Sequence, residues 1–289
     1  MPRGKKYSFG WIPDYPDIRD YTPKNPAILS MTSKIKGNAK ENPASVDLRE
    51  WCSPVEDQEQ LGSCTANAVA AVVEYFEKKS FGKYINASRL FLYKATRKLL
   101  HFDGDSGATL KGSLGSLVLF GMPPEEYWPY ETINFDQDPG PFCYAFGQNY
   151  RCISYFRHDP SGLSPQKVLD SVKKYLAAGI PSVFGFTVYD GISQADATGK
   201  VPFPGANEKL MGGHAIPAFG YDDTIVIENS LTGKKTKGAL LFQNSWGAGW
   251  GMNGYGWLPY EYILQGLACD FWSVLKQDWV DTGLFTSGE

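Results

Sequence analysis

Cys64 is the residue of this chain whose neighbours best suit a nucleophile. It follows a polar stretch, 58–63, and the apolar positions after it recur at helical spacing. Ser63 is the predicted N-cap, which places Cys64 in the first turn of a helix. Free backbone N–H groups and the helix dipole at such a place favour the thiolate form of a cysteine. A lone cysteine there is also often a small buried apolar residue, so catalysis needs partners elsewhere.

His214 is the best candidate for a base that serves this thiol. It opens a predicted strand directly after Gly212 and Gly213, whose small size lets other groups come close. The other histidines, His101 and His158, lie in polar surroundings and are expected at the surface. Taken alone, His214 could equally be a hydrogen-bonded, half-buried structural residue.

A third motif, 242–256, alternates tryptophans with glycines. Asn244 ends an apolar strand, and Trp246 and Trp250 are separated by residues too small to fill a core. A neutral amide that accepts from an imidazole N–H can fix the tautomer of the ring, and an indole can keep water off that bond. Thiol, imidazole and amide together indicate nucleophilic catalysis.

The chain resembles the papain-like cysteine peptidases of the C1 type, through blocks that follow one another in the family's order from residue 45 to about 275. The short leader and the Gly-Ser-Cys-Thr-Ala form resemble the bacterial branch, of the xylellain type. The blocks are Val46-Asp47-Leu48-Arg49, Gln58, Gly62-Ser63-Cys64, Trp128-Pro129-Tyr130, Gly213-His214-Ala215, Asn244-Ser245-Trp246-Gly247 and Gly249-Trp250-Gly251 through Gly254-Tyr255.

The resemblance implies an α+β fold of two lobes with a cleft between them. Residues about 45–160 would form a mainly helical left lobe, and about 161–289 a β-barrel-like right lobe. The activity would be hydrolysis of peptide bonds by an endopeptidase, through a thioacyl intermediate on Cys64 and without metal or cofactor.

The resemblance also implies a role for each site residue. Cys64 and His214 would form a thiolate–imidazolium pair, Asn244 would orient the histidine, and Gln58 would help to hold the oxyanion. The residues expected to bind substrate are Gly107 and Ala108 through their backbone, Leu110, Phe186 and Ala215 around a specificity pocket, and Trp246, which also shields the His214–Asn244 bond.

Several positions depart from the family pattern. Thr65 follows the cysteine where tryptophan is usual, and Leu61 and Asp105 stand where many members have disulfide cysteines. The usual long helical pro-region is missing. These differences leave the catalytic residues untouched, but they leave disulfides, fine specificity and the mode of latency open.

The elements that must position these residues change in character along the chain. Helices are predicted at 64–79, 86–100, 108–121 and 165–178, and strands at 181–189, 214–221, 239–244 and 255–258. The glycine-rich stretch 191–213 is predicted to be a long loop, and such loops often carry function.

Residues 1–44 form a leader of their own composition, rich in proline after Gly10. Residues 9–23 are predicted to be an extended, docked strap with Trp11, Ile12, Tyr15 and Tyr21 as its contact points, because disordered tails seldom carry so many aromatics. Disorder is expected for 1–8 and 30–42. The leader is expected to act as an intramolecular inhibitor in a zymogen.

Totals exclude some classes of partner. The net charge is −3, without a basic block, which argues against nucleic acid and membranes; protein or peptide substrates are the expected partners. The N-terminus lacks the apolar run of a secretory signal, so either a cytoplasmic place or export by a non-standard route is expected. A Cys143–Cys152 disulfide is possible from spacing, whereas Cys52 and Cys269 are expected to be free buried thiols.

Two other functions use the same residues. A transpeptidase or amidase would employ the same thiol, imidazole and amide, and a binding module could retain the frame without activity. Because Cys64 and His214 are both present, the non-catalytic alternative is the weaker one.

Overall fold

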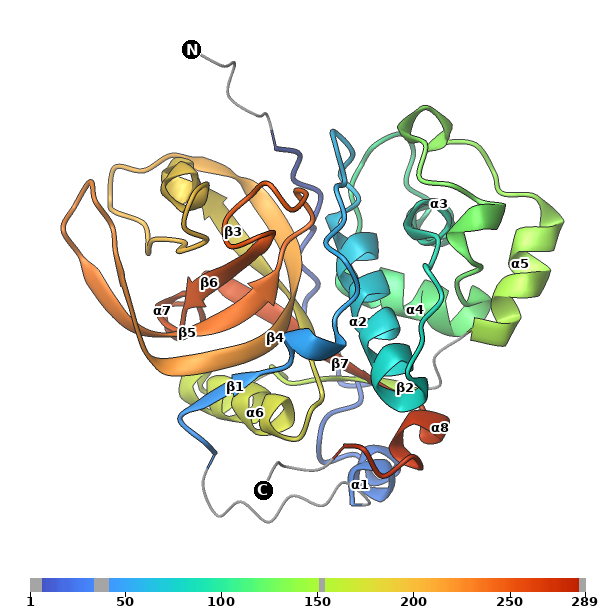
Figure 1. Ribbon diagram of the computed structural model, residues 1–289, viewed down its shortest axis with the longest axis horizontal. Coiled ribbons are helices and arrows are strands. Elements are labelled where there is room, and N and C mark those ends of the chain that lie inside the picture. Colours follow the sequence, from blue (N-terminus) through green and yellow to red (C-terminus); the bar gives the residue numbers. More distant parts are fainter. Residues whose placement is uncertain (1–6, 34–41, 151–153, 286–289) are drawn as a thin grey trace.

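The computed structural model describes residues 7–33, 42–150 and 154–285. Figure 1 shows the helices α2 to α5 on one side and most of the strands on the other, with the start of the chain passing between the two sides. The α-helices among the described residues are α1 (Pro26–Thr32), α2 (Cys64–Phe81), α3 (Arg89–Leu100), α4 (Leu110–Phe120), α5 (Pro141–Gly147), α6 (Pro165–Ala177), α7 (Glu261–Leu264) and α8 (Gln277–Val280).

The helix α2 forms the centre of the molecule. It packs on α3 and α4 on one side and on β4 of the sheet on the other. Its first seven residues, Cys64 to Ala70, are all buried, so this helix has no solvent-exposed face near its start. The helix ends where Gly82, at a φ of 71°, adopts the left-handed conformation that glycine accepts without steric cost.

The strands form one seven-stranded sheet in the order β2-β7-β3-β4-β5-β6, with β1 paired to β4. All of its pairs are antiparallel, and the described strands at its two ends, β2 and β6, do not pair with each other. The expected α+β two-sided fold is therefore found, but the sheet is open rather than closed into a barrel. The strands are β1 (Ser45–Asp47), β2 (Ser154–Arg157), β3 (Ser182–Tyr189), β4 (Leu210–Glu228), β5 (Lys235–Gln243), β6 (Tyr255–Pro259) and β7 (Ala268–Leu275).

The predicted division near residue 160, into a mainly helical and a mainly β part, stays a prediction, and each part contributes some elements to the other side. β1 and β2 come from the first part of the chain and join the sheet, whereas α6 comes from the second part and packs on β4. The four predicted helices and four predicted strands are all present, with shifted ends. β4 begins at Leu210, inside the stretch predicted to be a loop, and α1, α5, β2 and β7 were not predicted.

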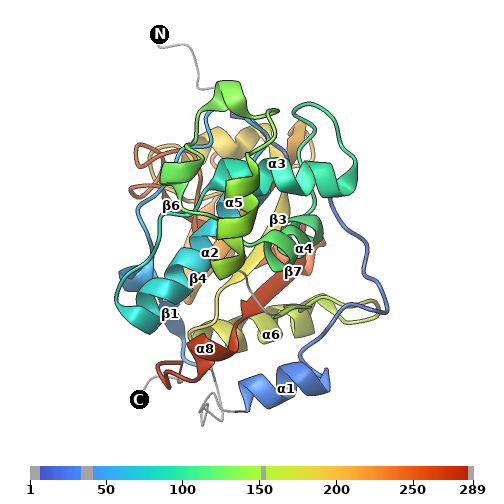
Figure 2. The ribbon, with the colours of Figure 1, turned by 90° about the vertical axis from the view of Figure 1, so that its right-hand side faces the viewer.

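The leader contains a helix, α1, whose last three residues, 30–32, fall in a stretch that was expected to be disordered. α1 buries Ile28 and Met31 and lies close to α8, beneath α6 in Figure 2. Asn25 caps it by accepting a hydrogen bond from the N–H of Ala27, and Pro26 stands at the first helical position, where proline is well tolerated. The rest of the segment expected to be disordered, 34–41, lies outside the described residues, as do residues 1–6. None of the described helices is long and apolar enough to cross a membrane.

The prediction that His158 lies at the surface is wrong, although His101 is exposed as expected. The His158 side chain is fully buried, and its two ring nitrogens lie 2.9 Å from the hydroxyls of Ser171 and Ser273. The burial of His158 could not be predicted from its polar neighbours in sequence, because the hydroxyl groups that contact it come from α6 and β7. Burial lowers the pKa of His158 to about 3.

Acid stability should reveal this buried histidine. The pKa of His158 in the unfolded chain is about 6.5, so the unfolded state binds more protons than the folded state between pH 6.5 and 3, and stability falls as the pH falls through that window. As the pH falls through this window, the free energy of unfolding measured in urea should therefore decrease by about 1.4 kcal/mol per pH unit more for the wild type than for His158→Gln. The exposed control His101→Gln should follow the wild type, and equal slopes for His158→Gln and wild type would contradict the assignment.

Candidate active site

Cys64 lies at the first position of α2, completely buried. The backbone N–H groups of Ala215, Gly10 and Thr65 lie near its sulfur and lower the pKa of the thiol, against the larger effect of burial. Ala215 follows His214, so the strand β4 and the helix α2 meet at the thiol. Ser63 occupies the N-cap position, but its hydroxyl lies 2.6 Å from that of Tyr130 and makes no capping bond.

His214 and Asn244 form the second part of the site. The Nε2 atom of His214 lies 2.9 Å from Oδ1 of Asn244, which also accepts the backbone N–H of Ser245 at 2.8 Å. Because that oxygen can only accept, Nε2 must carry the proton and Nδ1 must carry the lone pair. Nδ1 is buried without a hydrogen-bond partner among the described residues, as a base awaiting a proton would be.

Aromatic rings fix the plane of this histidine. Trp246 stacks on His214 with ring centroids 4.6 Å apart, and Phe186 meets the same ring edge-on at 5.8 Å. Phe186 pairs with His214 across β3 and β4. Trp246 therefore lies where its predicted shielding role needs it.

Gln58 is held from several sides. Its backbone N–H donates to the carbonyl oxygen of Ser245 at 2.8 Å, and its Oε1 accepts from the hydroxyl of Ser245 at 2.5 Å. The amide Nε2 consequently faces the other way, donating to Leu61 at 2.8 Å and to the carbonyl oxygen of Ser8 at 3.3 Å. The structure thus brings the four predicted catalytic residues into one region.

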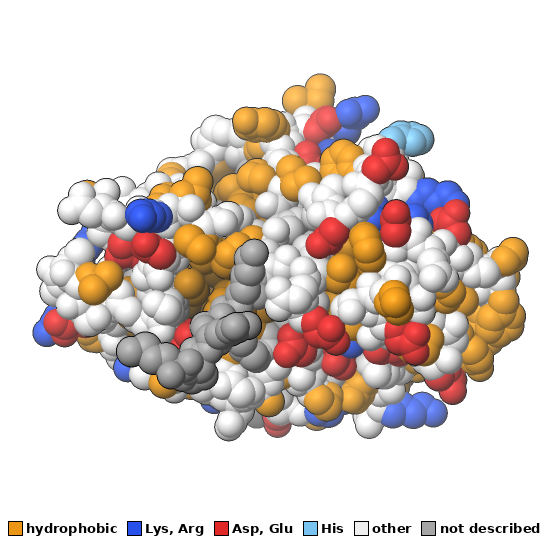
Figure 3. Space-filling view, turned by 90° about the horizontal axis from the view of Figure 1, so that it is seen from above, with side chains coloured by type: hydrophobic (Ala, Val, Ile, Leu, Met, Phe, Trp, Pro, Cys, Tyr) orange, Lys and Arg blue, Asp and Glu red, His pale blue; other side chains and the backbone are white. Residues whose placement is uncertain are grey.

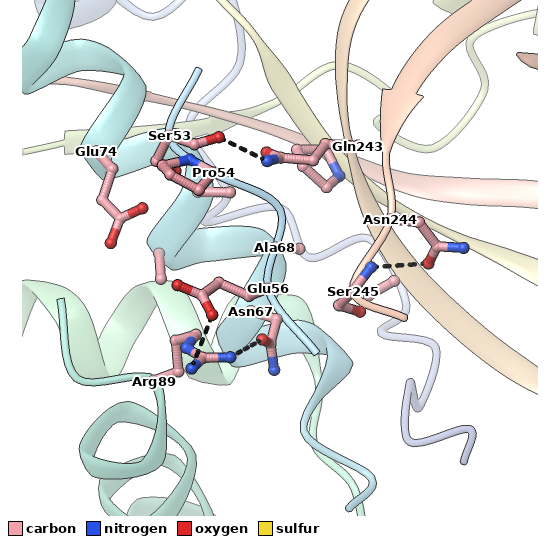
Figure 4. A pocket seen from close by; sticks show the side chains of 14 residues that line it. Ser53, Pro54, Glu56, Asn67, Ala68, Glu74, Arg89, Gln243, Asn244 and Ser245 are labelled. Carbon is pink, nitrogen blue, oxygen red and sulfur yellow. Dashed lines mark hydrogen bonds and ion pairs between the residues drawn. The ribbon is translucent and has the colours of Figure 1, made fainter. Parts of the chain in front are cut away.

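A small cavity lies behind these residues (Figure 4). Asn67 of α2 and Arg89 of α3 meet there at 3.0 Å, and Arg89 forms an ion pair with Glu56 at 3.2 Å. Asn244 and Ser245 line its other wall. The polar wall therefore joins the helices to the loop that carries the orienting amide.

Asp105 connects two loops of the site through hydrogen bonds. Its carboxylate accepts the N–H of Gly62 at 2.9 Å and the hydroxyl of Tyr93 at 2.5 Å, and that hydroxyl accepts the N–H of Gly107 at 3.1 Å. The loop before Cys64 is thereby tied to the loop of Gly107. The thiols of Cys52, Cys64, Cys143 and Cys269 are free, and Cys152 of the possible disulfide lies outside the described residues.

The leader passes over the thiol. The predicted strap was 9–23; from here on, the strap means residues 7–20. The carbonyl oxygen of Gly10 accepts the N–H of Ala108 at 2.8 Å, and the N–H of Ile12 donates to the carbonyl oxygen of Ala108 at 3.0 Å. On the opposite side, the N–H of Trp11 donates to the carbonyl oxygen of Gly213 at 3.1 Å. The strap is therefore hydrogen-bonded to both sides of the site.

The first described residues of the strap cover the rings of His214 and Trp246. Tyr7 stacks on Trp246 at 4.0 Å, and Phe9 meets both His214 and Trp246 edge-on. Figure 3 shows the molecule from above, where hydrophobic side chains lie near the middle and at the sides, with charged side chains between them. The expectation of disorder up to residue 8 is therefore wrong for Tyr7 and Ser8.

The far end of the strap is fastened by charge. Asp20 forms ion pairs with Arg157 at 3.2 Å and with Lys111 at 2.6 Å, and all but Lys111 are almost fully buried. Tyr15 was predicted to be a contact point, but 90% of it is exposed. Proline on either side of the tyrosine keeps the chain extended there, so its side chain has no surface to meet.

Burial by the strap changes the ionisation expected at the site. It raises the pKa of the Cys64 thiol to about 11 and lowers the pKa of the His214 imidazole to about 4. The N–H groups around the sulfur and the amide of Asn244 oppose these shifts only in part. In this covered state burial opposes the charged forms of both groups, and the thiolate–imidazolium pair stays a prediction for the open site.

The predicted substrate-binding residues lie near the strap. Ala108 pairs with it, Gly107 lies beside the Gly10 backbone, and Leu110, Phe186 and Ala215 are all buried. The side chain of Trp11 occupies a pocket formed by Gly185, Gly213 and Asp270; only Gly213 was singled out in the sequence, and not as part of a pocket. Two glycines and a carboxylate on separate strands leave no local pattern that could have revealed this pocket.

The comparisons with known proteins agree with this geometry. The model of the papain family cysteine proteases matches residues 42–267. An uncharacterized peptidase C1-like protein of Acanthamoeba polyphaga mimivirus is 32% identical over 282 residues, 92% of this chain and 86% of the viral protein. The germination-specific cysteine protease 1 of Arabidopsis thaliana is 25% identical over 221 residues, 75% of this chain but only 52% of the plant protein.

Solved structures give the same result. Xylellain, a cysteine protease from Xylella fastidiosa, is 33% identical with a TM-score of 0.72, over 96% of this chain and 98% of that chain. The digestive procathepsin L 3 of Tenebrio molitor shares the fold, with 20% identity and a TM-score of 0.60 over 85% and 77% of the two chains. The chain therefore belongs to the papain family of cysteine proteases.

Proposed function

We propose that this papain-family cysteine endopeptidase cleaves peptide bonds through Cys64 and is held inactive by its own strap. The observation that carries the proposal is that the strap is hydrogen-bonded to Ala108 on one side and to Gly213, the neighbour of His214, on the other, over the buried Cys64. A peptide carbonyl carbon must replace Gly10 there before any reaction can begin.

In the first step, Nδ1 of His214 takes the thiol proton, and the sulfur forms a bond to the carbonyl carbon of the substrate. The negative oxygen that develops is held by the Cys64 N–H and by Nε2 of Gln58. The histidine then gives its proton to the leaving amine as the C–N bond breaks. Water, deprotonated by the same ring, releases the acyl group and restores the thiol. Asn244 keeps the ring in the tautomer that this cycle requires.

The strap resists this chemistry because of the atom that it presents. Gly10 turns its N–H to the sulfur, and its carbonyl oxygen is engaged by Ala108. A nucleophile needs a carbonyl carbon, so the sulfur has no productive target at Gly10. The strap also occupies the backbone edge of Ala108, which a substrate strand would need.

A displaced strap is needed to test the activity. Gly10 packs so closely on Gly62 that a Cβ at position 10 would lie 1.8 Å from the Gly62 carbonyl oxygen. Gly10→Ala is therefore the form in which hydrolysis should be measured, by mass spectrometry of cleaved peptides. Hydrolysis products without amine adducts, in the presence of an added amine, support a peptidase; mainly amine adducts would instead indicate acyl transfer.

Replacing Gln58 tests the oxyanion site. Gln58→Ala in the Gly10→Ala background should lower kcat by on the order of 10²–10³, with little change in KM, because the donor acts on charge that develops only in the transition state. The exposed neighbour Gln60 provides the control variant, Gln60→Ala, which should keep full activity. An unchanged kcat for Gln58→Ala would remove this residue from the site.

A further inference from the structure

Trp11 fills a pocket that exists because two strand residues lack side chains. A Cβ at Gly185 would lie 1.9 Å from the indole ring, and a Cβ at Gly213 would lie 2.7 Å from the Trp11 carbonyl oxygen. Only 6% of Trp11 is exposed. The pocket is therefore shaped for a large flat side chain on a backbone that follows β4.

The end of this pocket is a carboxylate. The indole Nε1 of Trp11 donates to Oδ2 of Asp270 at 3.1 Å. The other oxygen, Oδ1, accepts from Arg157 and from the indole of Trp272, each at 2.7 Å. Asp270 is fully buried, so each of its oxygens depends on these donors rather than on water.

A β-bulge aims Asp270 into the pocket. Between the pairs Val183–Trp272 and Gly185–Cys269, β7 carries one residue more than β3. Asp270 lies in this bulge at a φ of 64°, and Asp159 accepts the backbone N–H groups of Asp270 and Phe271 at 2.6 and 3.0 Å. Bulges re-aim side chains in this way, and they recur next to active sites.

Removal of the strap would leave this carboxylate half satisfied. Arg157 and Trp272 belong to the body of the enzyme and keep Oδ1 in place, whereas Oδ2 loses the donor from Trp11. A buried acceptor without a donor is costly, so a side chain that restores the bond binds in preference to one that does not.

We propose that Asp270 selects substrates that place in this pocket a bulky side chain ending in an N–H donor, of which tryptophan and arginine are the natural examples. The inference rests on the proposed peptidase function and names the substrate class of that site. Trp11 holds the pocket in the covered enzyme by the same contacts that a substrate makes in the open one.

The direct test uses an isostere of tryptophan. In the Gly10→Ala enzyme, one tryptophan is moved through successive positions of an alanine peptide until the position that raises kcat/KM is found. Tryptophan there is then replaced with benzothienylalanine, which has the same shape but sulfur in place of the N–H. The tryptophan peptide should be cleaved at least tenfold faster, since a bond to a charged acceptor is lost in the other.

The variant Asp270→Asn should remove or reverse this preference. Asparagine tolerates the left-handed backbone, and the donors of Arg157 and Trp272 keep its amide oxygen at the Oδ1 place. Its NH₂ group then faces the N–H of the substrate. An unchanged thermal midpoint shows that the fold of Asp270→Asn is intact, and the distant control variant Asp138→Asn should keep the preference. An equal tryptophan to benzothienylalanine ratio in parent and Asp270→Asn would overturn the proposal.

A second measurement needs no peptidase activity. In the full-length chain, Asp270→Asn and Trp11→Phe should each raise the rate of Cys64 alkylation by about tenfold, because either change removes the bond that seats the strap. The double variant should react no faster than the single ones. Additive effects, or no effect of Asp270→Asn, would overturn the role of Asp270 even if no peptide were cleaved; absence of cleavage alone counts against the proposed function.

Discussion

Gly10→Ala is expected to convert a latent enzyme into an active one. The added methyl group meets the backbone of Gly62 at 1.8 Å, and neither side can yield by a side-chain rotation. Overpacking of this kind typically costs about 1–3 kcal/mol. Because 1.4 kcal/mol corresponds to a factor of ten, the population with an open cleft, and with it kcat/KM, should rise roughly 5- to 150-fold.

This substitution isolates the effect of the strap. It leaves the catalytic residues, α1 and the Asp20 ion pairs unchanged, whereas deletion of residues 1–42 would also remove the buried Ile28. Tyr15→Ala provides a matched control in the same segment, because 90% of Tyr15 is exposed. Equal activity of Gly10→Ala, Tyr15→Ala and wild type would mean that the strap does not limit access to the thiol.

Cys64→Ala in the Gly10→Ala background is expected to abolish hydrolysis. Loss of a catalytic nucleophile lowers turnover by on the order of 10⁶. The variant should fold as the parent does, since alanine is compatible with a helix start and, within the described part of the chain, Cys64 makes no hydrogen bond to another side chain that alanine would break. The measurement is the kcat for a peptide that the parent cleaves, together with the thermal midpoint.

Another buried cysteine provides the control for this loss. Cys143 is also a buried free thiol, but it lies on α5 away from His214. Cys143→Ala should therefore retain activity in the same background. Residual hydrolysis within a few fold of the parent in Cys64→Ala would place the nucleophile elsewhere.

The catalytic residues could be predicted because each lies in a short motif with its own local signal. Cys64 follows a polar loop and opens an apolar helix, and Asn244 ends an apolar strand before a run of tryptophan and glycine. The helices α2, α3, α4 and α6 could be predicted for a similar reason, since their apolar residues recur along the chain itself.

What could not be predicted depends on contacts between distant segments. His158 has polar neighbours in sequence, and only α6 and β7 supply the hydroxyls that bury it. The position and the hydrogen bonding of Asp270 depend on a β-bulge of β7 against β3 and on the indole of Trp11 in the leader. That the sheet is open rather than closed could not be predicted either, because the order of the strands is set by their pairing and not by the residue pattern within each strand.

The ionisation of the site was also beyond the sequence. A helix start favours a thiolate, but the strap removes water from both Cys64 and His214, and burial outweighs the helix in the covered state. Exposure of the site would weaken both shifts, and the ion pair needed for attack would then become accessible.

Labelling by a peptidyl epoxide tests the central claim most directly, because the reagent needs both an open cleft and a reactive thiol. The wild-type chain and Gly10→Ala are treated with the epoxide in parallel. The modified cysteine is located by mass spectrometry of the digested protein. Rapid labelling of Cys64 alone in Gly10→Ala, and labelling at least about fivefold slower in the wild-type chain, is the predicted result. Labelling at another cysteine, or at Cys64 with equal rates in both proteins, would contradict the account.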